Sequence, residues 1–123
     1  MWRLLFIVFL ILHAGIHLAI WATPKPRDPK MPFDASHSWL LGNQRALSVI
    51  LALAAAALRL TAGVGLMAHG ERWRPVAVSG LAVSLVLMIV YFHPWFLLAE
   101  ALNAALIVAI VWLDWPSKAM VGA

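Results

Sequence analysis

The chain has 123 residues, of which 64% are hydrophobic and 11% are charged, and it carries a formal net charge of +4 and no cysteine. This composition is too apolar for an ordinary soluble domain, and the lack of cysteine excludes disulfides, thiolate metal sites and iron–sulfur clusters. Because the basic residues are scattered rather than gathered in a patch with aromatic residues, they do not indicate nucleic-acid binding. We expect one integral-membrane domain, residues 1–123, with the lipid bilayer as its partner.

Four apolar segments are long enough to cross a membrane, since a helix rising about 1.5 Å per residue needs roughly 20 residues for a ~30 Å hydrocarbon layer. They cover about residues 3–21, 45–68, 76–92 and 95–113. In hydrocarbon every backbone N–H and C=O must be paired within its segment, so these segments are predicted to be helices. Only His93 and Pro94 separate the last two, which requires a tight turn. The expected fold class is therefore all-α, a transmembrane antiparallel four-helix bundle.

Tryptophans lie at the ends of these segments. They are Trp2, Trp21, Trp39, Trp73, Trp95, Trp112 and Trp115. The tryptophan ring favours the boundary between water and lipid because it is apolar while its N–H needs a polar partner. The pattern predicts a multi-pass protein of a cell membrane, with the bacterial inner membrane as the expected location. The basic residues divide evenly between the two sides of the predicted bundle, so they favour neither orientation.

Residues 22–44 form the long first loop. Prolines interleaved with charged residues exclude regular helix in its first half and favour extended chain. The later part, Phe33 to Gly42, is expected on the membrane surface. In the second loop, Gly70 is expected to end one helix as its C-terminal cap, and Pro75 is expected in the first turn of the next.

Two charged residues, Arg59 and Glu100, fall inside the apolar segments, and His13, His17 and Asn103 join them as candidate site residues. Ionisable groups in hydrocarbon are costly and usually face the interior of a bundle. Counting residues inward from the first and third loops, His17 and Glu100 share one depth. His13 and Asn103 share the next layer, and Arg59 lies deeper. The sequence thus predicts that three helices bring polar groups into the same half of the membrane.

The spacings within each helix also place these side chains on common faces. The two histidines are one turn apart, as are Glu100 and Asn103. We predict that the five residues form a ligand-binding or proton-handling pocket, open toward the first and third loops and capped by His93. The competing interpretation is structural: Arg59 and Glu100 neutralise each other through Asn103 or water and lock the helices together.

The sequence leaves the cofactor open between a divalent metal, haem and a quinone. His13, His17 and Glu100 are a ligand set that zinc or iron accepts, and either histidine can ligate haem iron. A histidine and a carboxylate in a membrane-accessible pocket can also exchange protons with a quinone head. No nucleophile with a neighbouring base and no pair of acids accompanies them. No catalytic residue is therefore assigned, and an enzyme is not expected.

Two functions agree with these features. The first is a ligand-binding protein or an accessory subunit of a larger membrane complex, linked to redox or quinone chemistry and without covalent catalysis. The alternative is a small proton-coupled transporter built as an oligomer of this chain, because chains of carboxylates and histidines carry protons in pumps.

Three stretches of the chain resemble the DoxX-like group of small bacterial four-helix membrane proteins. They are residues 3–5 leading to 13–18 (HAGIHL), residues 60–66 (LTAGVGL) and residues 88–94 (MIVYFHP). The resemblance implies the same four-helix membrane fold and an association with redox or membrane-stress functions. Members of the group often carry an acidic residue in the second helix, where this chain has Arg59.

Overall fold

The computed structural model describes residues 1–22 and 37–121. The long helices are α1 (Trp2–His17), α2 (Arg45–Met67), α3 (Trp73–Val90) and α4 (Leu97–Trp112), and the short ones are the π-helical turn η1 (Leu18–Ala22), the 3₁₀ turn η2 (Pro94–Phe96) and α5 (Lys118–Val121). The extended chain among the described residues is a small antiparallel hairpin of β1 (His37–Ser38) and β2 (Gly42–Asn43). The all-α prediction is confirmed. The proline-rich half of the first loop, Pro24 to Pro32, lies outside the described residues.

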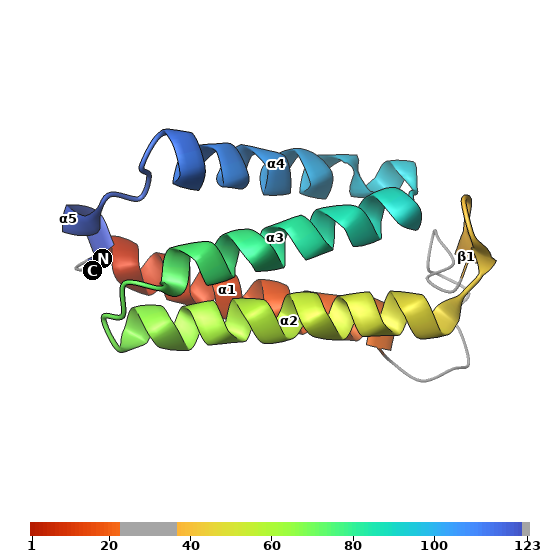
Figure 1. Ribbon diagram of the computed structural model, residues 1–123, viewed down its shortest axis with the longest axis horizontal. Coiled ribbons are helices and arrows are strands. Elements are labelled where there is room, and N and C mark those ends of the chain that lie inside the picture. Colours follow the sequence, from red (N-terminus) through yellow and green to blue (C-terminus); the bar gives the residue numbers. More distant parts are fainter. Residues whose placement is uncertain (23–36, 122–123) are drawn as a thin grey trace.

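The long helices lie side by side, and each packs against the next one in the chain (Figure 1). The first and last of them, α1 and α4, do not form a comparable packing contact in the described part of the chain. Both chain ends lie at one end of the molecule, and β1 lies at the other (Figure 1). The packing of α1 on α2, α2 on α3 and α3 on α4 therefore leaves a gap on the side where α1 and α4 face each other.

The turn between α2 and α3 corrects one prediction. Gly70 does not hold the left-handed position that ends α2, because His69 does, with φ of 55°. The His69 N–H donates to the Leu66 carbonyl at 3.2 Å, and the Gly70 N–H donates to the Gly65 carbonyl at 2.8 Å. These two bonds form a Schellman motif, in which Gly70 is the residue after the left-handed one. Pro75 lies in the first turn of α3 as predicted, although α3 begins at Trp73 rather than Val76.

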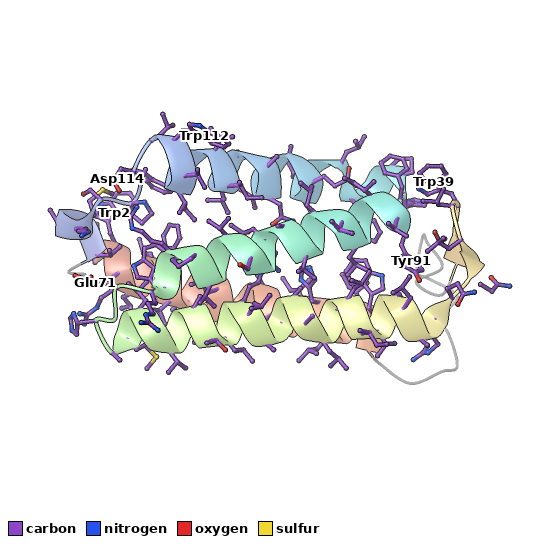
Figure 2. All side chains as sticks on the ribbon, in the orientation of Figure 1. Trp2, Trp39, Glu71, Tyr91, Trp112 and Asp114 are labelled. Atoms are coloured by element: carbon purple, nitrogen blue, oxygen red, sulfur yellow. The ribbon has the colours of Figure 1, made fainter. Side chains whose placement is uncertain are left out.

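Three helical segments of the described chain are long and apolar enough to cross a membrane, and they are Trp2–Trp21, Arg45–Met67 and Trp73–Val90. The fourth predicted segment, residues 95–113, is shorter as a regular α-helix, because the chain first makes the 3₁₀ turn η2 at Pro94. A 3₁₀ turn rises about 2 Å per residue, so η2 adds length to α4 along the same direction. Figure 2 places Trp2 and Trp112 near one end of the molecule and Trp39 near the other.

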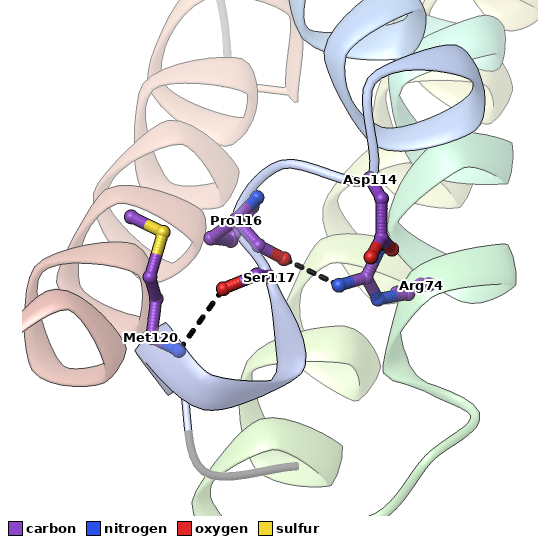
Figure 3. A network of polar contacts seen from close by, with 5 residues as sticks. All are labelled: Arg74, Asp114, Pro116, Ser117 and Met120. Carbon is purple, nitrogen blue, oxygen red and sulfur yellow. Dashed lines mark hydrogen bonds and ion pairs between the residues drawn. The ribbon is translucent and has the colours of Figure 1, made fainter.

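The C-terminal segment folds back across the end of the molecule. Arg74, at the start of α3, binds the Asp114 carboxylate at 2.7 Å and also donates to the Pro116 carbonyl (Figure 3). Beyond this clamp, α5 packs on α1, and Val121 is buried in the apolar core beside Phe6. Since Asp114 is well exposed, the ion pair itself contributes little, and the apolar contacts of α5 are the main attachment.

At Gly80, α3 packs closely against α2. A β-carbon at Gly80 would lie 3.1 Å from the Leu58 Cβ and 3.2 Å from the Arg59 Cγ. Small residues on the buried face of α2, among them Ala55 and Ala56, also allow close packing. Gly80 therefore makes room for the stem of a buried arginine between the two helices.

Gly80→Ala is expected to destabilise the protein by about 1–3 kcal/mol, because the added methyl overpacks against Leu58 and Arg59. Gly15→Ala is the matched control, since a β-carbon at Gly15 meets no heavy atom within 4 Å. That substitution should be neutral or stabilise α1 by up to roughly 1 kcal/mol through its higher helix propensity. Reversible unfolding in mixed detergent micelles measures both. Equal stability of the two variants would contradict close packing at Gly80.

Candidate functional site

Four buried polar side chains meet in the interior, and each comes from a different long helix. They are His17 of α1, Arg59 of α2, Ser84 of α3 and Asn103 of α4. The most exposed of them, His17, has only 4% of its surface accessible. We call this group the polar ring. It is a polar centre in helices whose other buried residues are mostly apolar.

Hydrogen bonds close the polar ring into a cycle. Arg59 donates through Nη1 to the His17 Nδ1 at 2.8 Å and through Nη2 to the Asn103 Oδ1 at 3.1 Å. The Ser84 Oγ lies 2.6 Å from the His17 Nε2 and accepts from the Asn103 Nδ2 at 3.1 Å. Each of the four side chains thus contacts two others, which ties all four helices together at one level.

The contacts of His17 allow two neutral tautomers. If Nδ1 accepts from the Arg59 guanidinium, which can only donate, Nε2 carries the proton and donates to Ser84. If Nδ1 instead donates to the His13 carbonyl 2.9 Å away, Nε2 accepts from the Ser84 hydroxyl and lies 3.4 Å from the Arg59 Nη1. In both cases an uncharged imidazole lies beside the Arg59 cation.

The charge of Arg59 has no acidic partner within the described residues. Its side chain is 0% exposed, it forms no salt bridge there, and its Nε has no hydrogen-bond partner. Arginine stays protonated in proteins, so the polar ring holds one positive charge that only neutral groups solvate. Such a buried charge is costly unless its surroundings supply compensation. This unbalanced charge is the main electrostatic feature of the interior.

Glu100 does not compensate Arg59. One of its carboxylate oxygens, Oε1, is buried without a hydrogen-bond partner among the described residues, and no contact joins it to the guanidinium. Glu100 also does not line the cavity described below, although Asn103 on the same helix does. Of the predicted bridge from Arg59 through Asn103 to Glu100, the described residues show only the bond between Arg59 and Asn103. The prediction that Glu100 faces the same pocket as the histidines therefore finds no support.

A cavity of about 190 Å³ lies between α1 and α4, next to the polar ring. We call it the polar chamber, and its lining residues are His13, Ile16, His17, Ile20, Trp21, Met88, Phe96, Ala99 and Asn103. Trp21 and Phe96, whose ring centroids are 5.2 Å apart, are both buried on the side of the first and third loops. Ile16, another lining residue on α1, is 49% exposed, so the cavity lies close to the surface of the molecule there. The predicted opening toward the first and third loops stays a prediction, because much of the first loop lies outside the described residues.

His13 and Trp21 add hydrogen-bonding capacity to this chamber. His13 Nδ1 lies 3.2 Å from the Phe9 carbonyl, which only accepts, so Nδ1 is the protonated nitrogen and Nε2 remains an acceptor. The indole Nε1 of Trp21 is buried with no hydrogen-bond partner among the described residues. Asn103 contributes an amide whose capacity the polar ring uses only in part. The chamber walls thus carry both donors and an acceptor.

A second cavity, of about 200 Å³, continues the gap toward the chain ends. We call it the apolar chamber, and it is lined by Trp2, Leu5, Phe6, Phe9, Leu102, Leu106 and Trp115. Phe9 of the apolar chamber contacts His13 of the polar chamber, with ring centroids 4.1 Å apart and ring planes tilted by 38°. The two chambers are therefore neighbours along α1, and these two rings lie between them.

The remaining predicted site residues lie apart from the polar ring. His93 follows α3 and contacts Phe96, with ring centroids 6.4 Å apart, but it does not line the polar chamber. The proposed metal ligands His13, His17 and Glu100 are not gathered, since the described residues contain no group of three or more His, Cys, Asp or Glu placed to hold a metal ion. His17 moreover faces a guanidinium, which would repel a metal cation.

Sequence reasoning missed two residues of the site. Ser84 is a polar residue within an apolar segment, as Asn103 is, and that signal alone could have included it. Trp21 was interpreted as a membrane-boundary residue, yet it is 2% exposed and lines the polar chamber. The π-helical turn η1, which carries Trp21, has no recognisable sequence signal. Such turns often occur at functional sites.

Comparison with known proteins does not add to this description. A scan against protein-family models, a search of curated proteins and a search of solved structures each found no match to the chain.

Ser84→Ala should reduce the free energy of unfolding by about 1–3 kcal/mol, because it leaves the His17 Nε2 and one Asn103 N–H buried without a hydrogen-bond partner. Ser79→Ala is the matched control on the same helix. Ser79 is exposed, and its hydroxyl donates to the Pro75 carbonyl of its own helix at 2.8 Å. That variant should stay within about 0.5 kcal/mol of the parent. Unfolding in mixed micelles compares the two, and an equal loss in both would contradict the closed cycle.

Proposed function

We propose that the chain is a multi-pass protein of a cell membrane, folded as a single transmembrane antiparallel four-helix bundle. The main support is its inverted polarity. Leucine, isoleucine and valine side chains remain exposed along all four long helices, whereas Arg59, Ser84 and Asn103 are buried. In hydrocarbon, apolar side chains belong on the outside and polar groups must pair inside. The expectation of a bacterial inner membrane and the resemblance to DoxX-like proteins remain part of this proposal.

Its proposed function is to bind a membrane-soluble molecule in the gap between α1 and α4. The observation that carries this proposal is the polar chamber, a cavity with mostly apolar walls and a few hydrogen-bonding groups around His17 and Asn103. Ligand sites commonly have this composition. In this proposal the molecule enters from the lipid, beside the exposed Ile16 of α1.

A quinone is the redox-active class of ligand that fits these groups. A quinone carbonyl accepts hydrogen bonds, which the Asn103 amide and the Trp21 N–H can donate. A quinol hydroxyl donates a hydrogen bond, which the His13 Nε2 can accept. The chamber therefore suits either form of the head, and the protein would act as a ligand-binding or accessory subunit without a covalent step.

The alternative, a small oligomeric proton-coupled transporter, is less compatible with the polar ring. His17, Ser84 and Asn103 could pass protons along their hydrogen bonds. However, the fixed charge of Arg59 lies at the same level and opposes the passage of protons or cations, as basic residues do in selective pores. We therefore favour binding over transport.

Filling the polar chamber tests the binding proposal. Ala99→Phe should abolish the saturable quenching of tryptophan fluorescence by decylubiquinone, or weaken its apparent affinity at least ~10-fold, because the added ring occupies the space of the ligand. Ala105→Phe, on an exposed face of α4 outside both chambers, is the matched control and should bind like the parent. Unchanged binding by the Ala99 variant would place the probe elsewhere and contradict the proposal.

A further inference from the structure

We propose that the polar chamber selects an anionic head group, so that its ligand is a single-chain membrane acid with an ionised carboxylate. This inference rests on the proposed ligand site and specifies the chemical class of its occupant. It begins from Arg59, whose positive charge is completely buried and is solvated by the neutral groups of His17 and Asn103.

The Arg59 charge acts on the chamber through the two residues that separate them. His17 and Asn103 bond directly to the guanidinium, and both line the chamber. A head group bonded to the Asn103 amide would lie up to roughly 8 Å from the guanidinium, the sum of two hydrogen-bond lengths and the width of the amide group. At an effective dielectric constant of about 20, opposite unit charges at that distance attract enough to change affinity on the order of 30-fold.

No other described charge opposes this effect within the chamber. Glu100 is the nearest acidic residue along α4, but it neither lines the chamber nor contacts Arg59. His13 lines the chamber and, as a neutral acceptor, leaves the sign of the potential unchanged. Arg59 is therefore the described charge that bonds directly to residues of the chamber lining, and we expect it to disfavour a cationic head.

The size and shape of the gap favour one chain over two. The polar chamber has about 190 Å³, and the neighbouring apolar chamber has about 200 Å³. Each is smaller than a typical drug-sized pocket of about 300–1,000 Å³. In the proposed complex the carboxylate occupies the polar chamber and its single chain passes the contact of Phe9 and His13 into the apolar chamber, which leaves no room for the second chain of a phospholipid. The Trp21 N–H and the Asn103 amide are the donors available to its oxygens.

A head-group series on one chain tests this proposal in the unmodified protein. The probes are 9,10-dibromostearic acid, its methyl ester and the corresponding alcohol, and each quenches tryptophan on contact through its bromines. At pH 8.5, where the acid is ionised, the acid should bind at least ~10-fold more tightly than the alcohol or the ester. If all three probes bind equally well and Ala99→Phe abolishes their binding, the anionic inference is overturned and the binding proposal stays intact. Binding that Ala99→Phe does not affect would overturn both.

Charge variants separate the field of Arg59 from a structural effect. In Arg59→Gln the acid should lose its advantage over the alcohol, which is measured as the ratio of the two affinities within that variant. Arg72→Gln removes the same charge from the exposed turn between α2 and α3 and should keep the preference. If Arg72→Gln also abolishes the preference for the acid, the overall charge of the protein rather than Arg59 sets the selectivity, and the inference fails. Should Arg59→Gln not fold, the probe series on the parent protein decides the question alone.

Discussion

The buried guanidinium of Arg59 is the interaction on which the rest of the interior depends. It requires acceptors from two other helices, and His17 and Asn103 provide them at 2.8 and 3.1 Å. Those two side chains in turn share Ser84 as a common partner. Because removal of one member would leave another buried group unpaired, the four residues stabilise the arrangement as a unit rather than as separate pairs.

The packing of α2 on α3 is adapted to this charge. Gly80 is the position where α3 passes the stem of Arg59, and a β-carbon there would lie 3.2 Å from its Cγ. The glycine therefore does two things at once: it lets the helices approach, and it leaves the guanidinium free to reach across to α1 and α4. Close packing by small residues and a polar centre are usually discussed as separate devices for joining helices. Here one position serves both.

The sequence was sufficient for the helices and for most of the polar centre. Apolar segments of known length predict helices directly. The structure also joins His17, Asn103 and Arg59, which the depth estimate placed in the same half of the membrane. It does not bring Glu100 into contact with them, and depth along a helix does not specify the rotation about its axis. The cavity was beyond prediction, because it depends on which helices pack together and on where the rings of Trp21 and Phe96 lie.

The gap between α1 and α4 is held at two places of different character. At the chain ends, the C-terminal segment joins them through apolar contacts, with Val121 in the core and Trp115 against Phe6 at 5.6 Å between ring centroids. In the middle, Asn103 is the member of α4 that connects to the polar ring. A ligand bonded to the Asn103 amide would compete with, or extend, the bonds that hold α4 to its neighbours. Occupancy of the chamber and the position of α4 are therefore coupled through one side chain.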